Sequence, residues 1–208
     1  APAQRLRGFS ELMEDMVLEP ELAAAILENV TRVTVASTNA ILKEAGQYVD
    51  VVSFSDDLGL QDWAYFRNEM FQKQVKPYLA RCVDAIHANT DAKVVMHSDG
   101  AIHHLIPDHI NIGVDVINPV QTTAWSMGAE ALKSEFGKNL GFWGAVDTQH
   151  ALPFGSPDEV RADVKSKIET LGPNGGYVLA SCHTIREEIP AENIRAIYEA
   201  ALEYGKYG

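Results

Sequence analysis

The chain has 208 residues, of which 46% are hydrophobic and 22% are charged, and its formal net charge is −12. These proportions are typical of a folded globular protein and argue against intrinsic disorder. The negative charge argues against nucleic acid or an anionic membrane as the main partner, because both attract positively charged surfaces. Two isolated cysteines, Cys82 and Cys182, form no disulfide framework, so the expected location is the reducing cytoplasm.

The first predicted element is a helix over residues 20–45, where apolar residues recur near the helical period. Pro20 stands at its start, where a missing N–H costs nothing, and Gly46 suits its end. Beyond this helix, short apolar segments alternate five times with helical segments. The predicted strands cover residues 49–54, 93–96, 114–117, 140–144 and 177–180, and the helices that follow them cover residues 68–88, 101–112, 129–136, 157–171 and 191–204.

The five predicted strands are apolar at most positions, which is typical of parallel strands covered by helices on both faces. Such an alternation forms either a closed barrel or an open doubly wound sheet, and the pattern alone leaves both open. No GxGxxG motif follows a strand, so a dinucleotide site lacks its usual motif. A complete (β/α)₈ barrel needs about 250 residues, and five units are three strands short of it.

Polar residues gather where the predicted strands end, which is the ligand-binding edge in both architectures. An apolar strand that ends in polar or titratable residues five times over is not explained by solubility alone. We therefore expect most of these residues to face a common pocket. They are Asp56 and Asp57, His97 and Asp99, Asn118 and Gln121, Asp147 and Gln149, and Cys182 and His183.

The segment His97-Ser98-Asp99-Gly100 is the most specific of these strand ends. Residues i and i+2 of an extended chain point the same way, so His97 and Asp99 can converge on one ligand, and His183 can join them from a later strand end. Two imidazoles and a carboxylate suit Zn²⁺ with an open position, or Fe²⁺. Direct substrate contact without metal and a structural pair that orients the loop are the alternatives.

The strand-end segments, taken in order, resemble the uroporphyrinogen decarboxylase superfamily. The resemblance runs from about residue 11 to the C-terminus. It implies a (β/α)₈ TIM barrel, of which the single domain 1–208 would be the C-terminal part, with about five βα units after a leading helix and about three N-terminal strands missing. The matching segments are residues 55–59, 97–100, 113–121, 132–137, 144–149, 175–177 and 189–193.

The resemblance implies one of two chemistries. Some members are zinc methyltransferases that work with corrinoid proteins and thiols, and they bind zinc through a His-x-Cys pair and a distant Cys. His97 matches the first ligand, Asp99 replaces the first Cys, and we favour His183 in the region of the second Cys. We therefore expect a metal-dependent methyltransferase-like enzyme with a corrinoid protein as partner, and a divalent ion, Zn²⁺ before Fe²⁺, at these three residues.

The remaining strand-end residues complete the predicted site. We expect His183, Asp147 and Asp57 to take part in catalysis, with Asp147 and Gln149 contacting the metal ligands or the substrate. The residues expected to bind substrate are Asp56, Asn118, Gln121 and Gln149.

Two alternatives remain. The first is a uroporphyrinogen III decarboxylase of porphyrin and heme biosynthesis, a lyase without metal or cofactor in which His183 would contact the porphyrinogen. The nearby cations, Lys133, Lys138 and Arg186, are few for a polycarboxylate substrate. The second is a catalytically incomplete barrel that only binds a ligand or partner. Because a partial barrel leaves sheet edges and apolar faces exposed, we also expect self-association.

Overall fold

The computed structural model describes residues 2–206. Its strands are β1 (Val51–Ser55), β2 (Lys93–His97), β3 (Val116–Asn118), β4 (Gly141–Val146) and β5 (Tyr177–Ser181). Its α-helices are α1 (Pro2–Arg7), α2 (Phe9–Leu18), α3 (Pro20–Ala45), α4 (Asn68–Gln74), α5 (Lys76–His87), α6 (Ile106–Asn111), α7 (Ala129–Phe136), α8 (Ala151–Phe154), α9 (Pro157–Leu171) and α10 (Ala191–Tyr204). Short 3₁₀ helices cover Gly46–Tyr48 and His103–Leu105.

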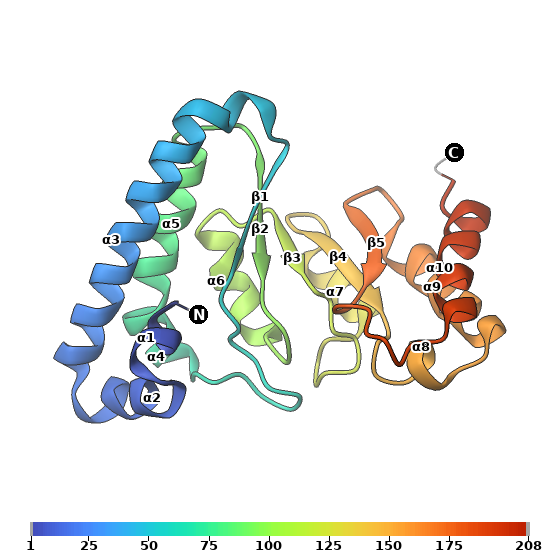
Figure 1. The fold of residues 1–208 in the computed structure, drawn as a ribbon, viewed down its shortest axis with the longest axis horizontal. Coiled ribbons are helices and arrows are strands. Elements are labelled where there is room, and N and C mark those ends of the chain that lie inside the picture. The colour runs from blue at the N-terminus through green and yellow to red at the C-terminus, as the bar shows by residue number, and fades with distance from the viewer. Residues whose placement is uncertain (1, 207–208) are drawn as a thin grey trace. The chain divides into compact units, whose positions relative to one another are not determined.

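The strands follow one another in the sheet in the order β1-β2-β3-β4-β5, with helices between them (Figure 1). The predicted parallel sheet with alternating helices is therefore confirmed. The register of β4 on β5 pairs Phe142 with Tyr177 and Val146 with Ser181. Because β4 and β5 are parallel, their carboxyl ends lie at the same edge of the sheet, and this register places the two ends side by side.

Several boundaries differ from the prediction, including the starts of β1 at Val51 and of β4 at Gly141. The predicted helix 68–88 is two helices, α4 and α5, because Pro77 starts a new helix and cannot continue the previous one. The predicted helix 101–112 begins only with the 3₁₀ turn at His103 and continues as α6, which has Pro107 in its first turn. The strand predicted at 114–117 starts at Val116, since the Asp115 carboxylate instead bonds the Val94 N–H and the Lys93 ammonium.

The chain forms two compact units. The first contains residues 2–57, 66–96 and 104–115. In this unit α3, with the predicted bounds 20–45, packs against α5 and α2 (Figure 1). The second contains residues 58–65, 97–103 and 116–206. Within residues 2–206, no helix has both the length and the apolar character that a membrane crossing requires.

The core of the second unit lies between the end of the sheet and α9 and α10, which pack side by side (Figure 1). Helix α9 begins with a capping box, in which the Ser156 hydroxyl accepts from the Glu159 N–H and the Glu159 carboxylate accepts from the Ser156 N–H. These bonds satisfy orphan donors at the start of the helix. The core residues are Val146, Leu152, Val160, Val164, Ile189, Ala196, Ile197 and Ala200.

Candidate functional site

Three titratable side chains meet at the strand ends of the second unit. His97 ends β2, Asp99 follows two residues later, and His183 lies two residues beyond β5. The Asp99 Oδ2 atom is 3.5 Å from His97 Nε2 and 3.8 Å from His183 Nε2. One potential ligand atom from each side chain lies within 4.8 Å of the other two. We call these three residues the His–Asp–His cluster.

The His97 ring is oriented by a neighbouring strand. Its Nδ1 atom lies 2.6 Å from the Oδ1 atom of Asn118 at the end of β3, and Asn118 Nδ2 lies 3.4 Å from the Trp143 carbonyl oxygen on β4. Because the amide oxygen can only accept, this contact is a hydrogen bond when Nδ1 carries the ring proton. The other ring nitrogen, Nε2, faces Asp99. The Asn118 amide contacts these protein groups, whereas the sequence analysis expects it to bind substrate.

The loop that carries Asp99 is fixed by backbone contacts. The buried Ser98 hydroxyl accepts from the Leu58 N–H at 2.9 Å, and the Ser98 N–H donates to the Asn118 carbonyl at 2.7 Å. Gly100 has φ 86° and lies against Gly59, where a Cβ atom would be 2.5 Å from the Gly59 carbonyl carbon. The turn after Asp99 therefore requires glycine, for both its backbone angle and its space.

Three glutamine amides form a network beside this loop. The Gln121 oxygen accepts from the Gly100 N–H, and its nitrogen donates to the Gln61 oxygen, each at 2.8 Å. The Gln149 nitrogen also donates to Gln61 Oε1, at 3.3 Å, and its oxygen accepts from the Thr123 hydroxyl at 2.6 Å. Gln121 and Gln149, which were predicted as substrate contacts, belong to this network and also line the adjoining cavity. Gln61, which was not predicted, joins them.

A cavity of about 380 Å³ adjoins the cluster, and Asp99 and His183 are part of its wall. Among the described residues, Arg186 is the one lysine or arginine in that wall, and Phe154 supplies an aromatic surface that is 84% exposed. Glu188 adds a carboxylate. The other lining residues are Gln121, Thr148, Gln149, Pro153, Cys182, Thr184 and Ile189.

Cys182 precedes His183 but differs from it in its chemistry. Burial, together with the negative charges of Asp99 and Asp147, raises the pKa of its thiol to about 12. A thiol with this pKa stays protonated at neutral pH and is a poor nucleophile. The atom that this strand end places beside Asp99 is His183 Nε2.

Asp147, predicted to be catalytic, has a local structural contact. Its carboxylate accepts from the backbone N–H groups of Gln149, His150 and Ala151, at 2.7, 3.2 and 3.2 Å. These bonds cap the turn that leads into α8. Its own N–H donates to the Asp163 carboxylate at 3.0 Å. The side chain therefore stabilises the loop after β4.

Asp56 and Asp57 follow β1 in the first unit, and the geometry of the His–Asp–His cluster does not include them. Burial raises the pKa of Asp56. A carboxyl group in such a place favours the neutral form.

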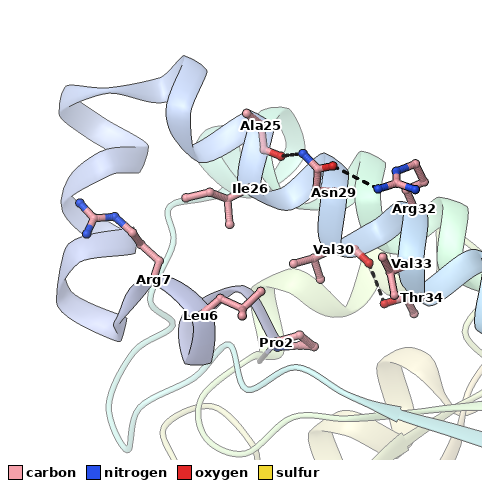
Figure 2. A pocket seen from close by; sticks show the side chains of 10 residues that line it. All are labelled: Pro2, Leu6, Arg7, Ala25, Ile26, Asn29, Val30, Arg32, Val33 and Thr34. Carbon is pink, nitrogen blue, oxygen red and sulfur yellow. Dashed lines mark hydrogen bonds between the residues drawn. The ribbon is translucent and has the colours of Figure 1, made fainter.

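The first unit has an apolar groove of about 540 Å³ between α1 and α3, seen in Figure 2. Its polar side chains have partners nearby: the Arg7 guanidinium pairs with the Asp15 carboxylate, and the others bond within α3. Asn29 donates to the Ala25 carbonyl and accepts from Arg32, and the Thr34 hydroxyl donates to the Val30 carbonyl. The groove therefore presents apolar surface from Leu6, Ile26 and Val33 rather than converging catalytic groups. The His–Asp–His cluster is the better candidate for chemistry.

Comparison with known proteins assigns the fold family. The family model described as uroporphyrinogen decarboxylase (URO-D) matches residues 3–204. The chain belongs to the uroporphyrinogen decarboxylase family. The resemblance seen in the strand-end segments is therefore confirmed.

Curated relatives carry the same family name. The uroporphyrinogen decarboxylase of Actinobacillus succinogenes is 22% identical over 204 residues, covering 96% of this chain and 53% of the relative. That of Anaeromyxobacter dehalogenans is 23% identical over 200 residues, with the same two coverages. The chain thus spans about half the length of the curated relatives it matches.

Among solved structures, a methyltransferase from Methanosarcina mazei superposes with a TM-score of 0.77 at 22% sequence identity. The match covers 98% of this chain and 56% of the methyltransferase. At this identity the likeness concerns the fold. It confirms the predicted partial (β/α)₈-barrel architecture.

Proposed function

We propose that this chain carries the metal centre of a methyltransferase-like member of the uroporphyrinogen decarboxylase family. His97, Asp99 and His183 would hold one divalent ion, with Zn²⁺ before Fe²⁺. The observation that carries the proposal is the convergence of their three ligand atoms within 4.8 Å. A corrinoid protein is the proposed macromolecular partner.

The donor set fits such an ion. Two imidazoles and one carboxylate are common ligands of catalytic zinc and of non-heme Fe²⁺. Bonds of about 2.0–2.2 Å place two ligands of one zinc ion within roughly 4.4 Å of each other. The distances of 3.5 and 3.8 Å from Asp99 to the two histidines meet this limit. With the ring proton on Nδ1, Nε2 is the His97 atom that would coordinate the ion.

A bound divalent ion would supply Lewis acidity and lower the pKa of a thiol or alcohol group on the substrate. The chain's own residues would shape the surroundings. The glutamine network holds the Asp99 loop in place. Arg186 and Phe154 would contact the body of the substrate in the adjoining cavity.

A second candidate is decarboxylation of uroporphyrinogen III, which is favoured by the name of the curated relatives, uroporphyrinogen decarboxylase. In this case His183 would contact the porphyrinogen and no metal would be needed. The cavity wall has a single described arginine or lysine, Arg186, and two carboxylates, Asp99 and Glu188. That charge balance opposes the binding of a substrate with many carboxylates, so we rank this function second.

Analysis of the metal content distinguishes the metal-dependent methyltransferase-like function from the decarboxylase. We expect near-stoichiometric zinc or iron in the protein purified without a chelating resin, and its loss in His97→Ala. His103→Ala is the matched control, because His103 pairs with Glu135 and lies outside the cluster. Absence of metal from the wild type as well as from His97→Ala, even after reconstitution with Zn²⁺ or Fe²⁺, would overturn the metal centre. Conversion of uroporphyrinogen III by the metal-free protein would then support the decarboxylase.

A further inference from the structure

We propose that Asn118 is a positioning residue that selects the ring tautomer of His97 and so makes the two histidines of the cluster unequal. His97 would be the anchored half of the centre and His183 the exchangeable half. The metal-binding consequence rests on the function proposed above. The tautomer itself can be measured in the metal-free protein.

The first step is the contact between the two side chains. Asn118 Oδ1 lies 2.6 Å from His97 Nδ1, which is a short distance for a hydrogen bond between an imidazole and an amide. An isolated neutral histidine in water favours the proton on Nε2. The amide oxygen reverses this preference, because it can bond to His97 only if Nδ1 carries the proton. Asn118 would therefore keep the Nε2 lone pair on the side of Asp99.

The second step is that Asn118 itself is held in place. Its Nδ2 atom lies 3.4 Å from the Trp143 carbonyl oxygen on β4, so the amide oxygen is the atom directed at His97. Its backbone carbonyl accepts from the Ser98 N–H at 2.7 Å, which ties β3 to the residue that follows His97. A rotated amide would turn its oxygen towards the Trp143 carbonyl oxygen, so that hydrogen bond would be lost.

The third step is the contrast with His183. Its Nε2 atom approaches Asp99, and its ring lies 6.3 Å from the His97 ring between centroids. Within residues 2–206, its Nδ1 atom has no hydrogen-bond partner. The His183 side chain is 45% exposed, against 27% for His97. His183 is therefore free to take either tautomer and to leave the ion, whereas His97 is preset to bind it.

The tautomer is tested by two-bond ¹H–¹⁵N correlation spectra of metal-free protein labelled with ¹⁵N-histidine, at a pH where His97 is neutral. We expect the Nδ1–H form in the wild type and in Asn118→Asp, whose carboxylate still accepts. We expect a shift to Nε2–H in Asn118→Leu and Asn118→Ala. Asn139→Ala, on the loop before β4, should change nothing. A wild type with Nε2–H, or an Asn118→Ala protein that keeps Nδ1–H, would overturn the proposal.

The metal-binding consequence is tested by competition with a chelator for Zn²⁺. Loss of such an outer hydrogen bond weakens metal binding about 10–100-fold, and we expect this range for Asn118→Ala and near-wild-type affinity for Asn118→Asp. If His97→Ala also leaves zinc binding unchanged, the metal centre fails, and the tautomer measurement still decides the role of Asn118. If His97→Ala abolishes zinc binding and Asn118→Ala does not alter it, the positioning role alone fails. A circular dichroism spectrum of each variant shows whether it is folded, and Asn118→Ala replaces Asn118→Leu if the leucine variant does not fold.

Discussion

The backbones of Gly100 and Gly59 touch so closely that neither residue has room for a side chain. A Cβ atom on Gly100 would lie 2.5 Å from the Gly59 carbonyl carbon, and one on Gly59 would lie 2.6 Å from the Asp99 carbonyl oxygen. The loop that carries Gly59 therefore lies directly against the turn that carries Asp99. The glycine after His-x-Asp is in this way part of the geometry of the cluster.

Gly100→Ala should therefore destabilise the protein and disturb Asp99. The positive φ and the close contact together predict a loss of roughly 2–5 kcal/mol of unfolding free energy, measured by urea denaturation. Gly128→Ala is the control, because Gly128 has φ −59° and no neighbouring atom within 4 Å of its added Cβ. An equal, small loss in both variants would contradict the close packing.

Asp147→Ala should lower the free energy of unfolding without reducing the zinc content of the protein. Its carboxylate accepts three backbone N–H groups at the start of α8, and removal of such a cap costs about 1–2 kcal/mol. Asp147→Asn, which keeps one acceptor oxygen, should recover part of this loss. Denaturant unfolding and zinc content report the two effects separately. Loss of zinc at unchanged stability would instead place Asp147 among the functional residues.

His109 predicts a pH dependence of stability. It is fully buried beside Phe71, and burial lowers its pKa from 6.5 to about 4 despite the bond between Nδ1 and the Leu105 carbonyl. Below pH 6.5 the His109 ring is protonated in the unfolded chain but stays neutral in the folded chain. The contribution of His109 to stability is therefore fully present above pH 6.5 and is lost as the pH falls towards 4. The loss can reach about 3 kcal/mol.

The variant His109→Leu isolates this contribution. The difference in unfolding free energy between the wild type and the variant should change with pH only between about 4 and 6.5. His150→Ala, whose side chain is 76% exposed, should leave the pH profile of the wild type intact. Parallel profiles for wild type and His109→Leu would show that His109 titrates normally.

Cys182 should resist alkylation in the folded protein. With the pKa of its thiol at about 12, the thiolate fraction at pH 8 is about 10⁻⁴. We expect little modification by iodoacetamide at pH 8 in the native state and full modification in urea, read by peptide mass spectrometry. Rapid native labelling of Cys182 would show that the thiol is neither buried nor protonated.

Local sequence patterns predicted the fold well because they act over short distances. Helix 20–45 has its predicted bounds, and all five strands occur in the predicted order. Helices α1 and α2 were not predicted: α1 has six residues and buries only Ala3, and α2 buries Leu12, Asp15 and Met16. The division of helix 68–88 was also missed, although Pro77 was the available signal.

The sequence by itself determined the alternation of strands and helices, the family and the segment His97-Ser98-Asp99-Gly100, because periodicity, proline, glycine and motif spacing are local properties. Only the tertiary structure decided which polar strand ends meet. In the structure His183 lies beside Asp99, and Asn118 contacts His97. The Asp147 carboxylate caps a turn. The side-chain amides of Gln121, Gln149 and Gln61 form one network. These partners are 21 to 88 residues apart, except at the local cap. Hydrogen bonds between such distant side chains depend on strand register and loop path, which no local pattern encodes.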